Sequence, residues 1–113
     1  GYIMSIVYVV QENPRVDILS ATKYGELLPL ANPSEQLHLS PGRIISLFKR
    51  KLKNFSDKDF LLLIGDPALI GVAVTVASDI NDGKVTVLKW DRIEKMYYPV
   101  KLSFRGGIGD YQQ

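Results

Sequence analysis

The densest group of side chains able to do chemistry is a run of cations between residues 43 and 53. The run contains no acidic residue, and its members are Arg43, Lys49, Arg50, Lys51 and Lys53. Guanidinium and ammonium groups bind phosphates, so a surface made of them can meet nucleic acid. The same pattern is typical of the solvated face of a packed helix, whose C-terminal dipole favours cations. The run is therefore the candidate nucleic-acid site, with the solvated helix face as its alternative.

A second candidate is the tripeptide Gly-Asp-Pro at residues 65–67, which separates two apolar runs. Ligands of open α/β sheets bind beyond the carboxyl ends of strands, where this tripeptide is expected to lie. No phosphate-binding glycine motif accompanies it, and Asp66 places a negative charge where a phosphate would sit. Asp before Pro is typical of a helix start, with Asp66 as N-cap. We interpret the tripeptide as a cap and keep Gly65 and Asp66 as the ligand-binding residues of an alternative, enzymatic hypothesis.

The sequence gives little support for a metal site or a catalytic group. Residues 79–83, DINDG, resemble a calcium loop, but the spacing of oxygen ligands is wrong and no glutamate closes the loop. Gly83 favours a helix stop there. There is no cysteine, and the single histidine, His38, has no evident catalytic partner. We expect no catalytic residue, metal or cofactor.

Aromatic and charged side chains concentrate around residues 89–98, KWDRIEKMYY. Side chains with an apolar body and a polar tip are common at protein interfaces. Trp90, Arg92 and Tyr97 are therefore candidate interface residues, with an ordinary hairpin as the alternative. Strand alternation separates Tyr97 from Tyr98, so one of the two is expected to be exposed.

Length and composition predict one small domain. The chain has 113 residues, a hydrophobic content of 46%, and 14 basic against 12 acidic residues, for a net charge of +2. This balance argues against a dedicated DNA-coating protein, although a local patch can still bind phosphate. We place the domain at residues 4–104. Residues 1–3 are then an upstream extension or a tag remnant, and residues 105–113 form a flexible Gly-rich tail.

Apolar periodicity predicts the elements that position these candidates. The order is a strand, an ordered loop with one helical turn, a hairpin, a helix, a buried strand, a helix and a C-terminal hairpin. This order predicts an α/β domain with a mixed sheet of about five or six strands and two main helices. The expected ranges are 5–11, 12–25, 26–40, 41–54, 59–65, 67–81 and 84–104.

The helices at 41–54 and 67–81 have different surface patterns. The first begins with Ser40 as a possible N-cap and gathers its apolar residues on one face, opposite the cations. The second is apolar on nearly all sides apart from a narrow small or polar stripe that includes Gly71 and Thr75. Alternating valines at 72, 74 and 76 would also suit a strand, but the start and stop signals favour helix.

Two consequences follow from the apolar stretch at residues 60–77. It is interrupted by Asp66 and Pro67, which are unfavourable in a membrane-spanning helix, so we expect no membrane segment. A helix apolar all round must also be buried all round, and this small domain offers few elements to cover it. The sequence therefore predicts self-association through the second helix, with Gly71 and Thr75 at the interface of a homo-oligomer.

The second half of the chain resembles a known group of proteins. The residues that carry the resemblance are 65–67 (GDP), 78–83 (SDINDG), 88–92 (LKWDR) and the tyrosine pair at 97–98. They are similar to short uncharacterised proteins of T4-like marine cyanophages that are abundant in ocean metagenomes. The resemblance implies a phage protein in the cytoplasm of an infected bacterium or in the virion, and it implies no catalytic residue.

The functional hypothesis from the sequence is a non-enzymatic phage accessory protein. It binds a macromolecular partner, with nucleic acid at residues 43–53 as the specific possibility, and it self-associates. The alternatives are an α/β enzyme that handles a small ligand or nucleotide near Gly65, and a minor structural protein of the virion.

Overall fold

A computed structural model describes residues 4–106 of the chain. The extension expected at residues 1–3, and all but the first two residues of the expected tail, lie outside these described residues. The elements are β1 (Ile6–Gln11), the 3-10 helix η1 (Leu19–Tyr24), β2 (Glu26–Ala31), the 3-10 helix η2 (Leu37–Leu39), α1 (Pro41–Lys51), β3 (Phe60–Leu62), α2 (Pro67–Ile80), β4 (Lys84–Asp91) and β5 (Met96–Ser103).

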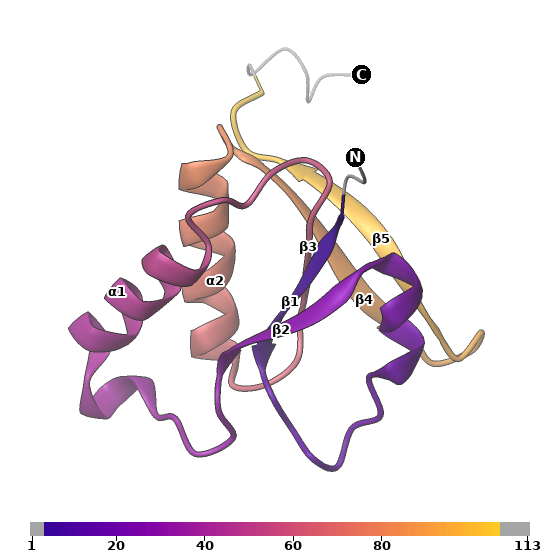
Figure 1. Ribbon diagram of the computed structural model, residues 1–113, viewed down its shortest axis with the longest axis horizontal. Coiled ribbons are helices and arrows are strands. Elements are labelled where there is room, and N and C mark those ends of the chain that lie inside the picture. Colours follow the sequence, from indigo (N-terminus) through magenta and orange to yellow (C-terminus); the bar gives the residue numbers. More distant parts are fainter. Residues whose placement is uncertain (1–3, 107–113) are drawn as a thin grey trace.

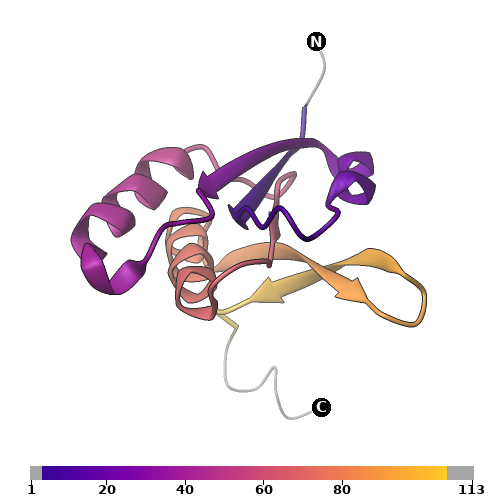
Figure 2. The ribbon, with the colours of Figure 1, turned by 90° about the horizontal axis from the view of Figure 1, so that it is seen from below.

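The strands form one mixed sheet in the order β2-β1-β3-β4-β5. The first four strands are parallel, and β5 pairs antiparallel with β4 as a hairpin. Helices α1 and α2 lie side by side on one face of the sheet, and η1 lies on the other (Figures 1 and 2). The predicted α/β class, mixed sheet, two main helices and C-terminal hairpin are confirmed.

The core is divided by the sheet into two apolar clusters. The larger lies under the helices. It joins residues of α1 and α2, among them Ile44, Phe48, Leu69 and Ala73, to inward-facing residues of the strands. The smaller lies under η1 and contains Leu62, Leu88 and Tyr97. The hydroxyl of Tyr24 in η1 donates a 2.8 Å hydrogen bond to the carbonyl of Tyr97, which fixes η1 to the β5 side of the sheet.

The start and stop signals of α2 act as predicted. The Asp66 carboxylate accepts a 2.8 Å hydrogen bond from the Ala68 N–H, and Pro67 opens the helix. At the other end, Gly83 adopts a φ of +80° and donates a 2.7 Å bond to the Ser78 carbonyl. These bonds satisfy terminal backbone groups of the helix. The strand suggested by the alternating valines does not form.

Helix α1 differs from its prediction at both ends. It ends at Lys51, three residues before the predicted boundary, because Leu52 turns inward as a fully buried residue and closes the helix. The Ser40 side chain makes no capping hydrogen bond, so the predicted N-cap role of Ser40 is wrong. Pro41 is nevertheless the first helical residue, where its missing N–H has little cost.

The predicted hairpin over residues 26–40 does not form. Residues 26–31 become β2, which pairs in parallel with β1 at the edge of the sheet, while residues 37–39 form η2. The chain has to leave the sheet after β2 because α1 crosses over to bring β3 to the far side of β1. A hairpin partner for β2 would instead have extended the sheet past its edge.

A buried carboxylate ties the sheet to the turn before β3. Asp59 is only 2% exposed and accepts hydrogen bonds from the Ile6 N–H at 2.9 Å, the Ser56 N–H at 3.0 Å and the Ser56 hydroxyl at 3.1 Å. These three donors compensate the removal of the charge from water. Asp59 therefore fixes the start of β1 against the turn at residues 56–59.

Each edge strand carries a proline. Pro29 lies in β2 and Pro99 in β5, and proline has no N–H to offer an approaching strand. Within residues 4–106, no helix combines the length and the apolar character needed to cross a bilayer.

Candidate functional site

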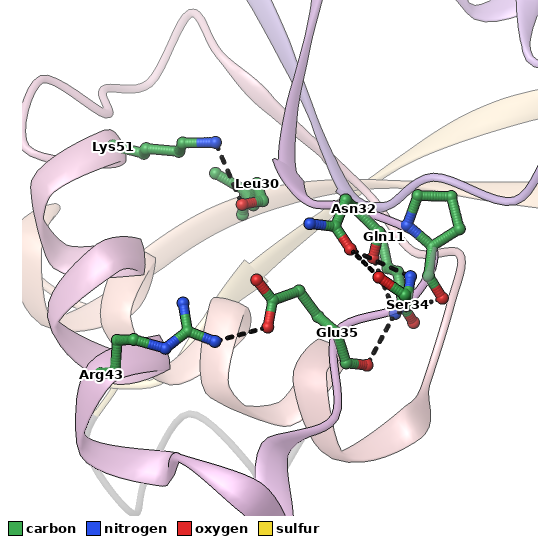
Figure 3. A network of polar contacts seen from close by, with 8 residues as sticks. Gln11, Leu30, Asn32, Ser34, Glu35, Arg43 and Lys51 are labelled. Atoms are coloured by element: carbon green, nitrogen blue, oxygen red, sulfur yellow. Dashed lines mark hydrogen bonds and ion pairs between the residues drawn. The ribbon is translucent and has the colours of Figure 1, made fainter.

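The cations of α1 divide into two groups by what they contact. Arg43 forms a 2.7 Å ion pair with Glu35, and the Lys51 ammonium donates to the carbonyls of Pro29 and Leu30 at 3.0 and 3.1 Å (Figure 3). Both side chains hold α1 against the segment that ends β2. The Lys51 ammonium therefore uses two of its three N–H donors inside the protein, whereas Arg43 engages one terminal nitrogen and its side chain stays 57% exposed.

The other three cations, Lys49, Arg50 and Lys53, are exposed. None of them forms an ion pair within residues 4–106. Lys49 lies in the last turn of α1 and Lys53 in the turn that follows the helix, and both side chains line the same groove. The predicted cation run thus reduces to a row of two ammonium groups with Arg50 beside them.

Lys49 and Lys53 form part of the wall of an open groove of about 1190 Å³. We call it the α1–α2 groove. Its wall on α1 also includes Ile45, its floor is the outward face of α2, and its far end is closed by residues just after β5. The residues used below are Ile45 and Lys49 on α1, Lys53 just after it, Ala68, Gly71, Val72, Thr75, Ser78 and Asp79 on α2, and Phe104 and Arg105.

The floor on α2 includes the small residues Ala68, Gly71 and Thr75, and within residues 4–106 no further helix or strand lies over the outer side of α2 (Figure 2). A methyl group added to Gly71 would meet nothing within 4 Å. Thr75 is exposed, and Phe104 at the far end is 54% exposed. Of the large apolar residues of α2, only Ile80, at 37%, is exposed, and the use of the second helix as an interface stays a prediction.

The charges at the far end of the groove are already compensated. Arg105 approaches Asp79 at 3.7 Å and forms a 2.5 Å bond with Asp82. The unpaired charge of the groove consequently comes from Lys49 and Lys53. The groove combines an apolar floor with a basic wall.

The edge of the sheet where open α/β folds bind ligands is filled by a side chain. The chain turns toward opposite faces of the sheet after β1 and after β3, and such a switch point forms a ligand crevice in many α/β proteins. Here Gln11, at the end of β1, is only 7% exposed. Its side-chain oxygen Oε1 accepts a 2.8 Å hydrogen bond from the Asp66 N–H. Gly65, with φ +110°, lies so close that a Cβ there would be 2.3 Å from Gln11 Cβ.

The amide nitrogen of Gln11 extends this contact to the end of β2. It donates to the carbonyls of Asn32, Pro33 and Glu35 at 3.1, 3.5 and 3.2 Å (Figure 3). Gln11 thus joins the ends of β1, β2 and β3, and Glu35 continues the network to Arg43 on α1. Sequence reasoning missed Gln11, because a polar residue that ends a strand gives no local signal of a tertiary role.

The aromatic hairpin residues lie away from the α1–α2 groove. Tyr97 packs into the cluster under η1, on the opposite face of the sheet, and is 2% exposed. Trp90 packs edge-on against the Tyr97 ring, with 4.9 Å between the ring centroids, and is 43% exposed. Arg92 lies exposed in the β4–β5 turn. Tyr98 is 37% exposed, so the prediction that one of the two tyrosines is exposed is confirmed. The structure does not bring the two sets of predicted interface residues together.

The DINDG segment ends α2, as predicted, and its side chains have partners. Asn81 donates to the Asp57 carboxylate at 2.8 Å, while Asp79 and Asp82 contact Arg105. In the part of the chain that the structure describes, no three histidine or carboxylate side chains gather in a way that could hold a metal ion. His38 is exposed in η2.

Comparison with known proteins adds one finding. A family model described as "Phage Pam3 gp32-like protein" matches residues 5–104, a range that contains every helix and strand of the structure. No curated protein and no solved structure matches the chain.

Proposed function

The chain belongs to the phage Pam3 gp32-like family, and we propose that it is a non-enzymatic phage accessory protein that binds a macromolecular partner through the α1–α2 groove. The observation that carries the proposal is the groove itself, an uncovered apolar floor beside two ammonium groups without ion pairs in residues 4–106. Exposed apolar surface of this kind marks interaction sites on small proteins.

The size of the groove favours a macromolecule over a small ligand. Pockets for small molecules enclose about 300–1,000 Å³ and bury most of the ligand. The α1–α2 groove is larger, at about 1190 Å³, and it opens to solvent along α2. A small molecule would contact one wall only, whereas a chain segment can span floor and wall together.

The alternative of a small-ligand enzyme near Gly65 and Asp66 has less support. Gln11 occupies the switch point, and the Asp66 carboxylate already accepts the Ala68 N–H. Asn81 and Asp82, two further polar residues that such an enzyme could use, lie just after the opposite end of α2, about 21 Å away for 14 helical residues. These groups cannot converge on one substrate atom.

Nucleic acid is one partner that α1 could bind, and its test is direct. If Lys49, Arg50 and Lys53 each neutralise one phosphate, affinity for duplex DNA should fall roughly 40-fold between about 50 and 200 mM salt. A mobility-shift assay with the triple glutamate variant should then show no binding at either salt. Absence of any shift with the unmodified protein at low salt would remove this branch.

We test the proposed function in a phage that encodes the protein. Thr75→Arg blocks the floor, and Lys49→Glu/Lys53→Glu reverses the wall. Arg15→Glu is the control, because Arg15 is an exposed cation on the loop after β1, outside the groove. Each variant is first shown to melt as the parent does. The groove variants should lose in competitive growth against the parent and the control should not. Equal growth of all variants would overturn the proposal.

The same surface can serve self-association, which the sequence predicts from α2. Light scattering at micromolar concentration gives the mass in solution. A monomer would leave the groove to a different molecule. The family match gives a phage protein, and we place it in the infected bacterium or in the virion. Mass spectrometry of purified particles separates these two locations. The narrower resemblance to T4-like marine cyanophage proteins stays a prediction.

A further inference from the structure

We infer that the partner in the α1–α2 groove is an amphipathic helix of another protein, with acidic residues along the flank that faces α1. This inference rests on the proposed function, because it names the occupant of the same groove. The shape of the floor, the position of the charges and the state of the backbone around the groove each bear on it.

The floor has the spacing of a helix-packing surface. Its outward positions, 68, 71, 72, 75, 78 and 79, recur every three or four residues along α2. Such rows form ridges and grooves into which the side chains of a second helix fit. The row spans 12 residues, from 68 to 79, and is about 17 Å long at a rise of about 1.5 Å per residue, which is three turns of a partner helix. The absence of a side chain at Gly71 allows a close approach near the middle of this row.

The backbone around the groove favours a helix over an extended segment. Both the floor and one wall are helices, whose own N–H and C=O groups are already bonded. An extended peptide on this surface would bury its backbone polar groups without partners, at a substantial cost for each group. A helix satisfies its own backbone and presents only side chains. Strand addition at a sheet edge does not offer an equivalent site here, because β2 and β5 both carry prolines.

The charges specify one side of the partner. Ile45 and Lys49 lie one turn apart on α1, and Lys53 lies in the turn just after the helix. All three line the groove, so this wall presents one apolar group and two ammonium groups. Neither ammonium group has an ion pair in the described residues, whereas Arg105 at the far end is paired with Asp79 and Asp82. The complementary surface is a helix with two carboxylates one turn apart on the α1 side and apolar residues toward the floor.

The same charges count against the two other occupants. In a symmetric contact between two copies, two grooves that each carry more cations than carboxylates in their lining would face one another, and Asp79 is already in contact with Arg105. Nucleic acid requires a polar, strongly basic surface, whereas here two lysines border an apolar floor. An acidic amphipathic helix matches both parts of the groove.

The experiment selects partners from a displayed library of helical peptides, with the full chain as bait. The peptides have apolar residues at the i, i+3, i+4, i+7 positions and random residues on both flanks. Selection should enrich Asp or Glu at two positions one turn apart on one flank only. A selected peptide should bind the Lys49→Glu/Lys53→Glu variant at least tenfold more weakly. Changing its two acids to lysine should restore binding to that variant and to no other.

A second pair of variants tests the floor. Gly71→Phe places a ring into the groove from a position where an added Cβ meets nothing within 4 Å, and should reduce binding of the selected peptide at least tenfold. Gly42→Phe is the matched control, because Gly42 lies on α1 outside the groove and is also free of neighbours within 4 Å. The control should bind as the parent protein does.

The other outcomes overturn the inference in ways that can be told apart. Enrichment of neutral or basic flanks, or binding unaffected by the charge swap, overturns the acidic partner. Salt-sensitive binding of a 20-nucleotide DNA that displaces the peptide shows that nucleic acid is the occupant. A dimer that Gly71→Phe dissociates shows that a second copy is the occupant. In each case the phage competition experiment still stands, and only unimpaired growth of the groove variants removes the proposed function itself.

Discussion

The hydrogen bonds of Gln11, the buried residue that ends β1, predict that replacing its side chain causes a large loss of stability. Gln11→Ala removes the acceptor of the Asp66 N–H and a donor group shared among three carbonyls. The two amide hydrogens and the one accepted bond amount to three hydrogen bonds, each with a net contribution of about 1 kcal/mol. The expected loss is therefore about 3 kcal/mol, a large fraction of the 5–15 kcal/mol typical of a domain.

Urea unfolding, followed by circular dichroism, measures this loss. With a slope of about 2 kcal/mol per molar urea, the midpoint should fall by roughly 1.5 M. Gln11→Glu is the informative companion, because it keeps the size and the acceptor but turns a carboxylate toward three carbonyl oxygens. It should be at least as unstable as the alanine variant. Glu12→Ala, at the exposed neighbouring position, is the control and should stay within about 0.5 kcal/mol of the parent. A Gln11→Ala midpoint equal to that of the control would refute the role assigned to Gln11.

Three further predictions use the same unfolding measurements. Asp59→Ala strips the Ile6 N–H and the Ser56 groups of a buried acceptor and should cost about 2–4 kcal/mol, so a loss below 1 kcal/mol would contradict its assigned role. Gly71→Ala should stabilise the protein by about 0.5–1 kcal/mol, because alanine is the better helix former and the new methyl meets nothing within 4 Å, and a lower melting temperature would show that the floor is already covered. Burial raises the pKa of the Tyr8 and Tyr97 hydroxyls, with the charges of nearby carboxylates adding to it. Since the unfolded chain ionises first, at about pH 10, stability should be constant below that pH and fall above it, less steeply in Tyr8→Phe, and equal slopes in both proteins would contradict this.

Local signals were sufficient to predict the second half of the fold. The segment from Asp66 to Gly83 carries a complete set of helix start and stop residues, and the structure uses Asp66 and Gly83 as the sequence predicts. The alternating valines do not form a strand, because a strand needs a neighbouring strand to satisfy its backbone hydrogen bonds. A capped helix satisfies its own. The hairpin of β4 and β5 was equally predictable, since two β-rich runs flank a short turn, which has four residues in the structure.

Local signals failed where pairing depends on distant segments. The β-like residues before α1 predicted a second hairpin strand, but no neighbour is available beyond the edge strand β2. Gln11 was missed for the same reason, because its partners come from the ends of β2 and β3. The α1–α2 groove was only half predictable. The basic face of α1 and the apolar character of α2 follow from local patterns, while their adjacency follows from two consecutive crossovers on one face of the sheet (Figure 1).

The routes by which this fold can meet another molecule are narrowed by its own contacts. The strand edges carry Pro29 and Pro99, and the Lys51 ammonium lies on two carbonyls of β2. The carboxyl end of the sheet is filled by Gln11, and the face under η1 is closed by the Tyr24 hydrogen bond to β5. In each of these places, the groups that could bind another molecule are absent or already in contact with the protein itself. The floor of the α1–α2 groove remains exposed. It lies beside the wall where Lys49 and Lys53 have no ion pair in the described residues. Because both features face the same space, a single partner can cover the apolar surface and neutralise the charge at once, which is why the groove, and not the glycine-aspartate turn, carries the functional proposal.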